Sequence, residues 1–411
     1  MAALGLDFGT SNTAAAVTVN GKPWVIPLED GASTLPTAVF LDFGSGEMLF
    51  GQTAARAMTS GTEGRFMRSL KSILGTPLAQ EKRQFLNQKM TLIEVIGLFL
   101  KEIKSRAEAA TYQTYDLVVS GRPVRFHSAS EERNAQALID LEEAYRLAGF
   151  KSVSFLAEPE AAALAVGGQG RLLIVDIGGG TSDFTVCDKD ENGMRVLASQ
   201  GIRLGGTDFD RALSLAHVMP LLGYGATIGN EIGAGGHTAP RSLFQDLATW
   251  EKITFVYGPQ LLRDVRKWER RAEEPQLFAR LAEVLEAHLG HDLAYAVEAG
   301  KIAANTDQTG RINLGFVEKT LAVALGVEDI TRDLGSFGAE IADCALETVR
   351  MAGVSPQTID RVVYVGGSSM MNIVRGNIAA AFPHAKSETS EVFTAVAHGL
   401  ALAADRHTKG N

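Results

Sequence analysis

Two short segments of the same type most constrain what this chain can fold into. Residues 4–17 read LGLDFGTSNTAAAV and residues 173–186 read LIVDIGGGTSDFTV. In both, an apolar run leads into an aspartate, a glycine-rich turn with threonine or serine, and a second apolar run. Asp7 and Asp176 lie 169 positions apart (176 − 7 = 169), and the first glycine of each turn keeps this offset. Because glycine tolerates positive φ, each segment predicts a β-hairpin, and the pair predicts two related halves.

Helix and strand patterns lie between and after these hairpins. An apolar stripe at helical spacing covers residues 92–103, and residues 261–304 are rich in leucine and alanine. Ser128 to Glu131 has the pattern of a capping box, and Gly149 is placed as the glycine that follows the helix. Strand candidates are Leu117–Val119, Val153–Leu156, Arg311–Phe316 and Val362–Val365. Strands and helices that alternate in two halves predict an α/β fold.

Composition excludes several classes of protein. The chain has 411 residues, 45% of them hydrophobic, which predicts two or three domains with a substantial core. Its net charge of −9 argues against binding nucleic acid. The two cysteines, Cys187 and Cys344, are expected to be buried, with no zinc-site spacing. No secretory signal and no apolar run of about 18 residues is present, so we expect a cytoplasmic protein without membrane contact.

Two polar regions are expected to lack regular structure. Residues 223–240 hold many glycines and few large apolar side chains, which predicts a long loop. The last four residues, Thr408–Asn411, are expected to be frayed.

The glycine turns carry the chemistry. Tight glycine turns expose successive backbone N–H groups, and such nests bind phosphate oxygens. Thr10, Ser11 and Thr181 add hydroxyl donors beside them. Each strand brings one carboxylate, Asp7 or Asp176, to its turn, and two opposed carboxylates with a polyphosphate form an oxygen site for Mg²⁺. One such turn alone is only a hairpin, whereas two related copies indicate nucleotide binding.

The motifs resemble those of a known superfamily. DFGTSNT and DIGGGTSDF are similar to the paired phosphate loops of actin, hexokinase and the heat-shock chaperones. Further segments resemble the family's connecting segment, second-lobe phosphate motif, two adenosine-contacting segments and terminal crossing helix: LAEPEAAALAVGG (156–168), GGTDFD (205–210), VEAGKIAAN (297–305), VGGSSMMNIV (365–374) and AVAHGLALAA (395–404). The resemblance extends over essentially the whole chain.

Other segments resemble the DnaK-type chaperone branch. Residues 33–58 have its layout of proline, strand and turn, and FMRSLKSILG (66–75) resembles the segment with its catalytic lysine. VVSGRPVRF (118–126) and MPLLGYG (219–225) are closer to its YegD-like subgroup.

The resemblance implies the actin-like ATPase fold, an α/β fold with two related lobes. Each lobe would hold a ribonuclease-H-like mixed sheet with helices on both faces and a smaller subdomain, with the nucleotide cleft between the lobes. We expect lobe I at 1–170 with a subdomain at about 29–110, lobe II at 171–387 with one at about 216–334, and a terminal helix at 388–411 that returns to lobe I.

The resemblance also assigns catalytic roles. Lys71 would orient the attacking water and offset charge near the γ-phosphate. Glu158 would hold a water of the magnesium shell or act as a base. Thr181 would bond the γ-phosphate, and Asp183 would position the water. From their sequence neighbourhoods alone, Lys71 reads as a solvated lysine on a helix and Glu158 as an ordinary carboxylate at a helix start.

The implied cofactors are ATP and Mg²⁺. Asp7 and Asp176 would be the carboxylates of the metal site. The expected nucleotide contacts are Gly9, Thr10, Ser11, Asn12, Lys71, Gly178, Gly179, Gly180, Thr181, Gly205, Gly206, Thr207, Glu298, Lys301, Gly366, Gly367 and Ser368. Glu298 and Lys301 lie three residues apart on one helical face, and an exposed ion pair within the helix is the other interpretation of this pair.

The chain departs from the chaperone pattern at the adenine clamp and in its length. Met370 and Ile302 stand where the chaperones usually carry the two arginines that clamp adenine. Pro123 and Arg133 match the interlobe switch of the chaperones. No linker and no peptide-binding domain follow the terminal helix segment, so we expect the output to go to another protein, or the function to differ from peptide clamping.

These features predict a chaperone-like ATPase that hydrolyses Mg-ATP slowly and couples lobe closure to an unidentified protein partner or client. A filament-forming protein of the actin or MreB type is the first alternative. A small-molecule kinase of the same superfamily is the second. The oligomeric state and the role of residues 223–240 are left open by the sequence.

Overall fold

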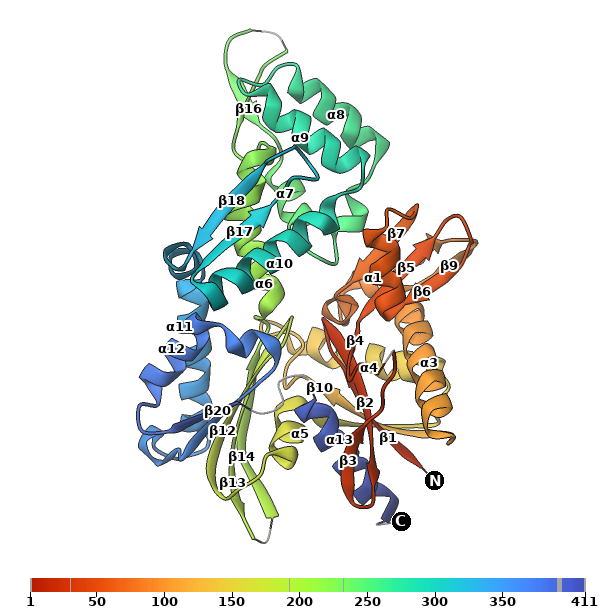
Figure 1. Ribbon diagram of the computed structural model, residues 1–411, viewed down its shortest axis with the longest axis vertical. Helices are drawn as coiled ribbons and strands as arrows, with labels where there is room; N and C mark the ends of the chain where they lie inside the picture. Colours follow the sequence, from red (N-terminus) through yellow and green to blue (C-terminus); the bar gives the residue numbers. More distant parts are fainter. Residues whose placement is uncertain (1, 30, 192, 232, 390–393, 410–411) are drawn as a thin grey trace. The chain divides into compact units, whose positions relative to one another are not determined.

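The computed structural model of the chain describes residues 2–29, 31–191, 193–231, 233–389 and 394–409 (Figure 1). Contacts between residues divide the chain into two compact units. The first unit combines Met1–Gly206 with Gly338–Asn411, and the second is Thr207–Phe337. No helix among the described residues is long and apolar enough to cross a bilayer.

The first unit contains a sheet built around the first hairpin. Its strands run in the order β11-β10-β1-β2-β3, and the short β4 pairs with β2. β1 is parallel to β10 and antiparallel to β2. The strands are β1 (Ala3–Phe8), β2 (Asn12–Val19), β3 (Lys22–Val25), β4 (Leu35–Pro36), β10 (Leu117–Arg122) and β11 (Ser152–Ala157).

A second sheet of the same unit repeats this plan. Its order is β14-β13-β12-β19-β20, in which β12 is antiparallel to β13 and parallel to β19. The strands are β12 (Gly170–Ile177), β13 (Ser182–Asp190), β14 (Gly193–Ile202), β19 (Arg361–Val365) and β20 (Lys386–Thr389). Even the register repeats, since Asp7 pairs with Ala14 and Asp176 with Asp183. The predictions of an α/β fold and of two related hairpins are therefore confirmed.

Two helices pack closely against these sheets. α5 (Glu158–Ala165) and α13 (Ala395–Lys409) share a buried core with β10, β12 and β19. The approach of the backbones requires glycine, because a Cβ at Gly399 would lie 1.7 Å from the Ala161 carbonyl oxygen. A Cβ at Gly5 would likewise lie 2.5 Å from the Ala401 nitrogen. Gly399 of α13 and Gly5 of β1 thus let α13 lie against α5 and β1.

The longer helices of this unit show where local signals hold. α3 (Leu92–Thr111) follows the predicted stripe and begins with a capping box that the sequence analysis missed, in which Thr91 and Glu94 cap each other. α4 (Glu131–Leu147) ends as predicted before Gly149, which has a φ of 88°. The capping box predicted at Ser128 is wrong. Ser130 caps α4, and the Ser128 hydroxyl accepts the Arg203 backbone N–H instead. α12 (Asn372–Ala381) also belongs to this unit.

A smaller group of elements in the first unit lies between β4 and α3. Three strands pair in the order β6-β5-β7, and two more form the hairpin β8–β9. Their bounds are β5 (Ala38–Asp42), β6 (Met48–Phe50), β7 (Gly64–Arg68), β8 (Arg83–Phe85) and β9 (Gln88–Met90), with helices α1 (Gly51–Thr59) and α2 (Pro77–Gln80). A 3₁₀ turn, Leu70–Ile73, follows β7.

The second unit is mostly helical. Its helices are α6 (Gly206–Leu213), α7 (Arg241–Leu247), α8 (Pro259–Glu269), α9 (Pro275–Glu286), α10 (Gly290–Asp307) and the start of α11 (Val327–Met351). β17 (Thr309–Asn313) pairs with β18 (Ala322–Gly326), so the strand predicted at 311–316 ends earlier than expected. The loop predicted at 223–240 is partly wrong, because β15 (Thr227–Gly229) and β16 (Gly236–Thr238) form a short hairpin there.

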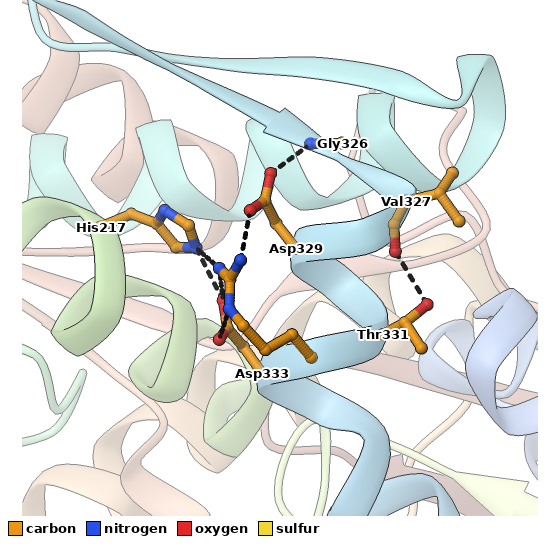
Figure 2. Close-up of polar contacts among 7 residues, drawn as sticks. His217, Gly326, Val327, Asp329, Thr331 and Asp333 are labelled. Atoms are coloured by element: carbon orange, nitrogen blue, oxygen red, sulfur yellow. Dashed lines mark hydrogen bonds and ion pairs between the residues drawn. The ribbon is translucent and has the colours of Figure 1, made fainter.

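A polar cluster joins α11 to a π-helical turn, Ser214–Val218, within the second unit (Figure 2). His217 Nε2 lies 2.7 Å from Asp333 Oδ2. Arg332 contacts both Asp333 and Asp329, and Asp329 also accepts the backbone N–H of Gly326. The cluster fixes the first turns of α11 against the turn that carries His217.

The predicted tail lies only partly within the described residues. α13 continues to Lys409, and residues 410–411 lie outside them, as do residues 390–393 before the helix. Both cysteines are buried, as predicted.

Candidate functional site

The first predicted phosphate loop joins β1 to β2. β1 is an apolar, largely buried strand that ends at Phe8. The chain then turns at Gly9, whose N–H donates to the Asn12 carbonyl at 3.1 Å. A Cβ at Gly9 would lie 2.3 Å from that same oxygen, so the turn requires glycine. Thr10 and Ser11 occupy the tip, and the Ser11 carbonyl accepts the Thr37 N–H at 2.9 Å. The loop is thus held in one conformation.

The second loop, between β12 and β13, has the same geometry. The Gly178 N–H donates to the Thr181 carbonyl at 3.0 Å, at positions offset from Gly9 and Asn12 by the repeat of the sequence. The Gly178 carbonyl accepts the N–H of Gly206 at 3.0 Å. The Thr181 hydroxyl bonds to the Asp183 carboxylate, which also accepts the Val124 N–H at 2.6 Å. Val124 was missed by sequence reasoning, because a backbone donor carries no sequence signal.

The two loops lie against each other. A Cβ at Gly179 would lie 2.5 Å from Ser11 Oγ, and a Cβ at Gly180 would lie 3.0 Å from Thr10 Oγ1 and 3.2 Å from Ser72 Oγ. Glycine therefore permits the close approach of the loops. The structure brings together the two halves of the predicted phosphate site and adds Ser72, which sequence analysis did not single out.

Two further predicted segments reach the second loop. A Cβ at Gly205 would lie 2.7 Å from the Gly179 carbonyl, and a Cβ at Gly206 would lie 2.4 Å from Ser368 Oγ. Gly366 has a φ of 77° and lies beside Ile177 and Asp176 at the end of β12. Gly367 and Ser368 follow it in a 3₁₀ turn. Backbone from three separate loops therefore surrounds the turn at Gly178.

Lys71 and Glu158 form a buried ion pair in the same region. Lys71 lies in the 3₁₀ turn after β7, and Glu158 begins α5, where Pro159 follows it. Their side chains are 6% and 12% exposed, and the ammonium contacts the carboxylate directly. Burial lowers the pKa of Lys71, but Glu158 and two aspartates raise it more, so that its net pKa is raised. Lys71 is therefore not the solvated helix lysine that its neighbourhood in the sequence allowed.

The backbone that holds Lys71 is unusual. Ser69, two residues earlier, is fully buried and has a φ of 60°, a left-handed backbone conformation that residues other than glycine rarely adopt. Its carbonyl accepts the Ser72 N–H at 3.0 Å. Strained positions of this kind cost on the order of 1–3 kcal/mol and cluster at functional sites.

Three aspartates surround this ion pair. Burial and the charge of Glu158 raise the pKa of Asp7 to about 7 and that of Asp183 to about 7. Burial raises the pKa of Asp176 well above its usual value, with further contributions from Glu158, Asp183 and Asp7. Lys71 lowers the pKa of all three. Four carboxyl groups around one ammonium therefore form a cluster, here called the acidic cluster, that has excess negative charge.

The acidic cluster fits a divalent cation. Mg²⁺ binds through one or two carboxylates plus waters and phosphate oxygens, rather than in a cage made only of protein. No three His, Cys, Asp or Glu side chains in the described part of the chain are arranged to hold a metal by themselves. Asp7 and Asp176, at the ends of β1 and β12, are the carboxylates expected to serve such an ion.

Thr207, Glu298 and Lys301 belong to the second unit. Lys301 is buried and pairs with Asp210, whose carboxylate lies 2.6 Å from the ammonium. Burial raises the pKa of Asp210, Lys301 lowers it, and Glu298 raises it. The Trp250 indole nitrogen lies 3.5 Å from the same carboxylate. The interpretation of Lys301 as part of an exposed ion pair within α10 is therefore wrong. Asp210 is a partner that the sequence analysis missed.

The two positions without the clamping arginines are surface-exposed. Ile302 is exposed on α10 and Met370 ends the 3₁₀ turn after Gly366. An arginine does lie near Met370, because Arg375 on α12 contacts its sulfur at 3.0 Å and also stacks over the Tyr364 ring.

Comparisons with known proteins give matches to the first half of the chain. The family model described as "Hsp70 protein" matches residues 3–220, more than half of the sequence. Over 220 residues the chain is 36% identical to a protein named "Chaperone protein DnaK" from Thermoplasma acidophilum. The match covers 51% of this chain and 34% of that relative, so the chain matches about a third of the relative's length. Every member of the acidic cluster lies within the matched residues.

Proposed function

The chain belongs to the Hsp70 protein family, and we propose that it binds and slowly hydrolyses Mg-ATP as a chaperone-like ATPase module. The family has the predicted actin-like ATPase fold, with which the two mixed sheets agree. The products would be ADP and inorganic phosphate. The proposal includes coupling of ATP-dependent lobe closure to an unidentified protein partner or client. The cytoplasmic location stays a prediction.

The observation that carries the proposal is the contact between the two glycine loops beside the acidic cluster. Backbone N–H groups of the turns at Gly9 and Gly178 suit phosphate oxygens. Thr10, Ser11 and Thr181 add hydroxyl donors at the same place. Mg²⁺ would supply the positive charge that the carboxylates need, and the polyphosphate would accept hydrogen bonds from the loops.

The chain's own residues suffice for slow hydrolysis. Phosphoryl transfer needs placement of the reactants and neutralisation of charge rather than covalent help. In the proposed mechanism the Lys71 ammonium offsets charge that develops on the transferred group. Asp183, held by the Val124 N–H, orients the attacking water. Glu158 keeps Lys71 in position and would hold a water beside the metal, which would supply positive charge to the phosphates.

The direct test compares wild type with Lys71→Met in nucleotide binding and phosphate release. We expect the variant to bind ATP about as tightly but to hydrolyse it ~10²–10³ times more slowly, as for the loss of a preorganised charge contact. Because the substitution leaves Glu158 without its cation, the double variant Lys71→Met/Glu158→Gln serves as a companion that removes both charges of the pair. Hydrolysis by Lys71→Met at the wild-type rate would contradict the assignment.

Two measurements separate the alternatives that the sequence left open. Sedimentation with and without ATP tests for a filament, since nucleotide-dependent pelleting is expected only of a polymer. Following the γ-phosphate tests for a small-molecule kinase, because a kinase moves it to an added metabolite, whereas the proposed ATPase releases inorganic phosphate. The Hsp70 match over residues 3–220 favours the ATPase module over both.

A further inference from the structure

A second site of interest lies on the smaller group of strands in the first unit, apart from the acidic cluster. A pocket of about 380 Å³ opens between the sheet β6-β5-β7 and the hairpin β8–β9; β5, β6, β7 and β9 are labelled in Figure 1. Its lining residues are Leu41, Phe43, Gly46, Arg65, Gln84, Leu86 and Asn87. Pockets that bind ligands start at about 300 Å³, so this one is suited to one or two side chains rather than to a nucleotide.

The pocket contains an arginine without a counter-charge. Arg65 is half-buried on β7, where its backbone pairs with Leu41 on β5, and among the described residues its guanidinium has no hydrogen-bond or ion-pair partner. Buried arginines are normally paired, because an uncompensated charge away from water is costly. An anion in the pocket would remove that cost.

The neighbouring charges also favour an anion beside Arg65. Burial lowers the pKa of Arg65, and the positive charge of Arg83 on the adjacent hairpin lowers it further. Arg83 itself is held by Glu81 at 2.6 Å. Asp42, which follows Leu41 on β5, uses its carboxylate to accept the backbone N–H groups of Gly44 and Ser45. The pocket therefore retains positive charge.

The rest of the lining is suited to an apolar group beside the anion. Phe43, just after the end of β5, is 50% exposed, and Leu86 forms the opposite wall at the tip of β8–β9. Leu86 has a φ of 50°, and the Gln84 amide donates to its carbonyl at 2.6 Å. A left-handed leucine is a strained conformation, and such positions are common where a loop serves a ligand. The amides of Gln84 and Asn87 offer additional hydrogen bonds at the rim.

From these observations we propose that the pocket binds an acidic peptide segment, with a carboxylate on Arg65 and a neighbouring apolar side chain between Phe43 and Leu86. The planar guanidinium presents paired N–H donors that match a carboxylate. The pocket lies at the turns of two surface hairpins, where a peptide can cross, and it holds the side chains of one or two residues. The proposal does not depend on nucleotide binding at the acidic cluster.

The test uses the whole protein and two capped peptides, acetyl-Gly-Leu-Glu-Gly-amide and its glutamine twin. The side-chain Nε–Hε resonance of Arg65 is followed by NMR as each peptide is added. We expect saturable shifts with the glutamate peptide and at least about tenfold weaker binding of the glutamine peptide, which keeps the shape but loses the charge. Equal binding of the two peptides would overturn the proposal.

Two variants and one small anion complete the design. Arg65→Gln should abolish binding of the glutamate peptide, followed through the amide resonances of Phe43 and Asn87. Lys89→Gln, which removes an equal charge from β9 outside the pocket lining, should bind as wild type does. Unchanged binding by a folded Arg65→Gln variant would overturn the assignment. Saturation by acetate at the concentration that suffices for the peptide would overturn the choice of a peptide as the ligand.

Discussion

Asp176 and Asp183 are direct cross-strand partners on β12 and β13, so two carboxyl groups lie opposite each other at the mouth of the second glycine turn. Like charges in such a pair destabilise a sheet. Both side chains are buried, and each has a raised pKa. The protein thus holds an unfavourable arrangement of charge in the place where the proposed metal and phosphates would bind.

This arrangement predicts the pH dependence of the stability of the protein without metal and nucleotide. The pKa of Asp183 and of Asp7 is about 7 in the folded protein, against an ordinary value of 3.8. Between these two values the folded state binds more protons than the unfolded state. The free energy of unfolding should therefore fall as pH rises from about 4 to about 7.

Melting temperatures measured between about pH 5 and pH 8 in a chelator check this prediction, with Asp183→Asn as the comparison. The asparagine keeps an acceptor for the Val124 N–H but has no charge to lose. Its melting temperature should decline less steeply than that of wild type. Mg²⁺ with an ATP analogue should flatten the wild-type curve. Parallel curves for the two proteins would show that the Asp183 carboxyl does not titrate in this range.

The second glycine turn offers a matched pair of substitutions. A Cβ at Gly179 would lie 2.5 Å from Ser11 Oγ, whereas a Cβ at Gly178 would meet no atom within 4 Å. Gly179→Ala should therefore destabilise the nucleotide-free protein by about 1 kcal/mol, because the Ser11 hydroxyl must turn away and Thr10 Cβ would lie 3.3 Å from the added methyl group. Gly178→Ala should leave that stability nearly unchanged. If the open space beside Gly178 receives phosphate, Gly178→Ala should still weaken ATP binding.

Thermal melting and a binding titration on the same samples separate these effects. The informative result is the behaviour of Gly178→Ala, in which no contact of the empty protein is disturbed. Normal stability together with normal ATP affinity would argue that phosphate lies elsewhere.

The sequence was most informative where local pattern and structure coincide. The two hairpins and their repeat could be predicted because each consists of an apolar strand, an aspartate and a glycine turn within about 14 residues. The end of α4 at Gly149 was likewise a local signal. These features need no knowledge of distant parts of the chain.

Other features depend on contacts between distant residues. The left-handed Ser69, which precedes Lys71, has no glycine or asparagine to signal it. The Ser128 hydroxyl bonds to Arg203, 75 residues away, rather than capping a helix. The Arg65 pocket also arises from strands that meet only in the folded chain. Spacing along one helix could not reveal any of these.

The buried pair of Asp210 and Lys301 gives a stability prediction for the second unit. Their side chains are 5% and 8% exposed, and their charged atoms lie 2.6 Å apart. Lys301→Met would leave the Asp210 carboxylate buried without its cation, at a cost of about 3–5 kcal/mol. The double variant Asp210→Leu/Lys301→Met, which removes both charges, should recover much of this loss.

Chemical denaturation of the single and double variants measures the effect. Lys267→Met is the control, since Lys267 pairs with Asp264 at 3.3 Å on the exposed side of α8 and should contribute less than about 1 kcal/mol. A Lys301→Met variant as stable as Lys267→Met would contradict the importance of the buried pair.

The cluster around His217 predicts an opposite pH dependence at acidic pH. Burial raises the pKa of Asp333, but its bonds to Arg332 and His217 lower it more, so that its net pKa lies below the ordinary value of 3.8. A carboxyl group with a depressed pKa contributes stability above its unfolded pKa and loses it as pH falls through the folded value. Asp333→Asn should therefore cost about 1–3 kcal/mol at neutral pH, and the difference from wild type should shrink below about pH 4.

Unfolding followed between about pH 2.5 and pH 7 measures this difference, with Asp343→Asn, a substitution of an exposed aspartate on the same helix, as the control. A difference that stays constant across this range would mean that the effect of Asp333 comes from packing rather than from its charge.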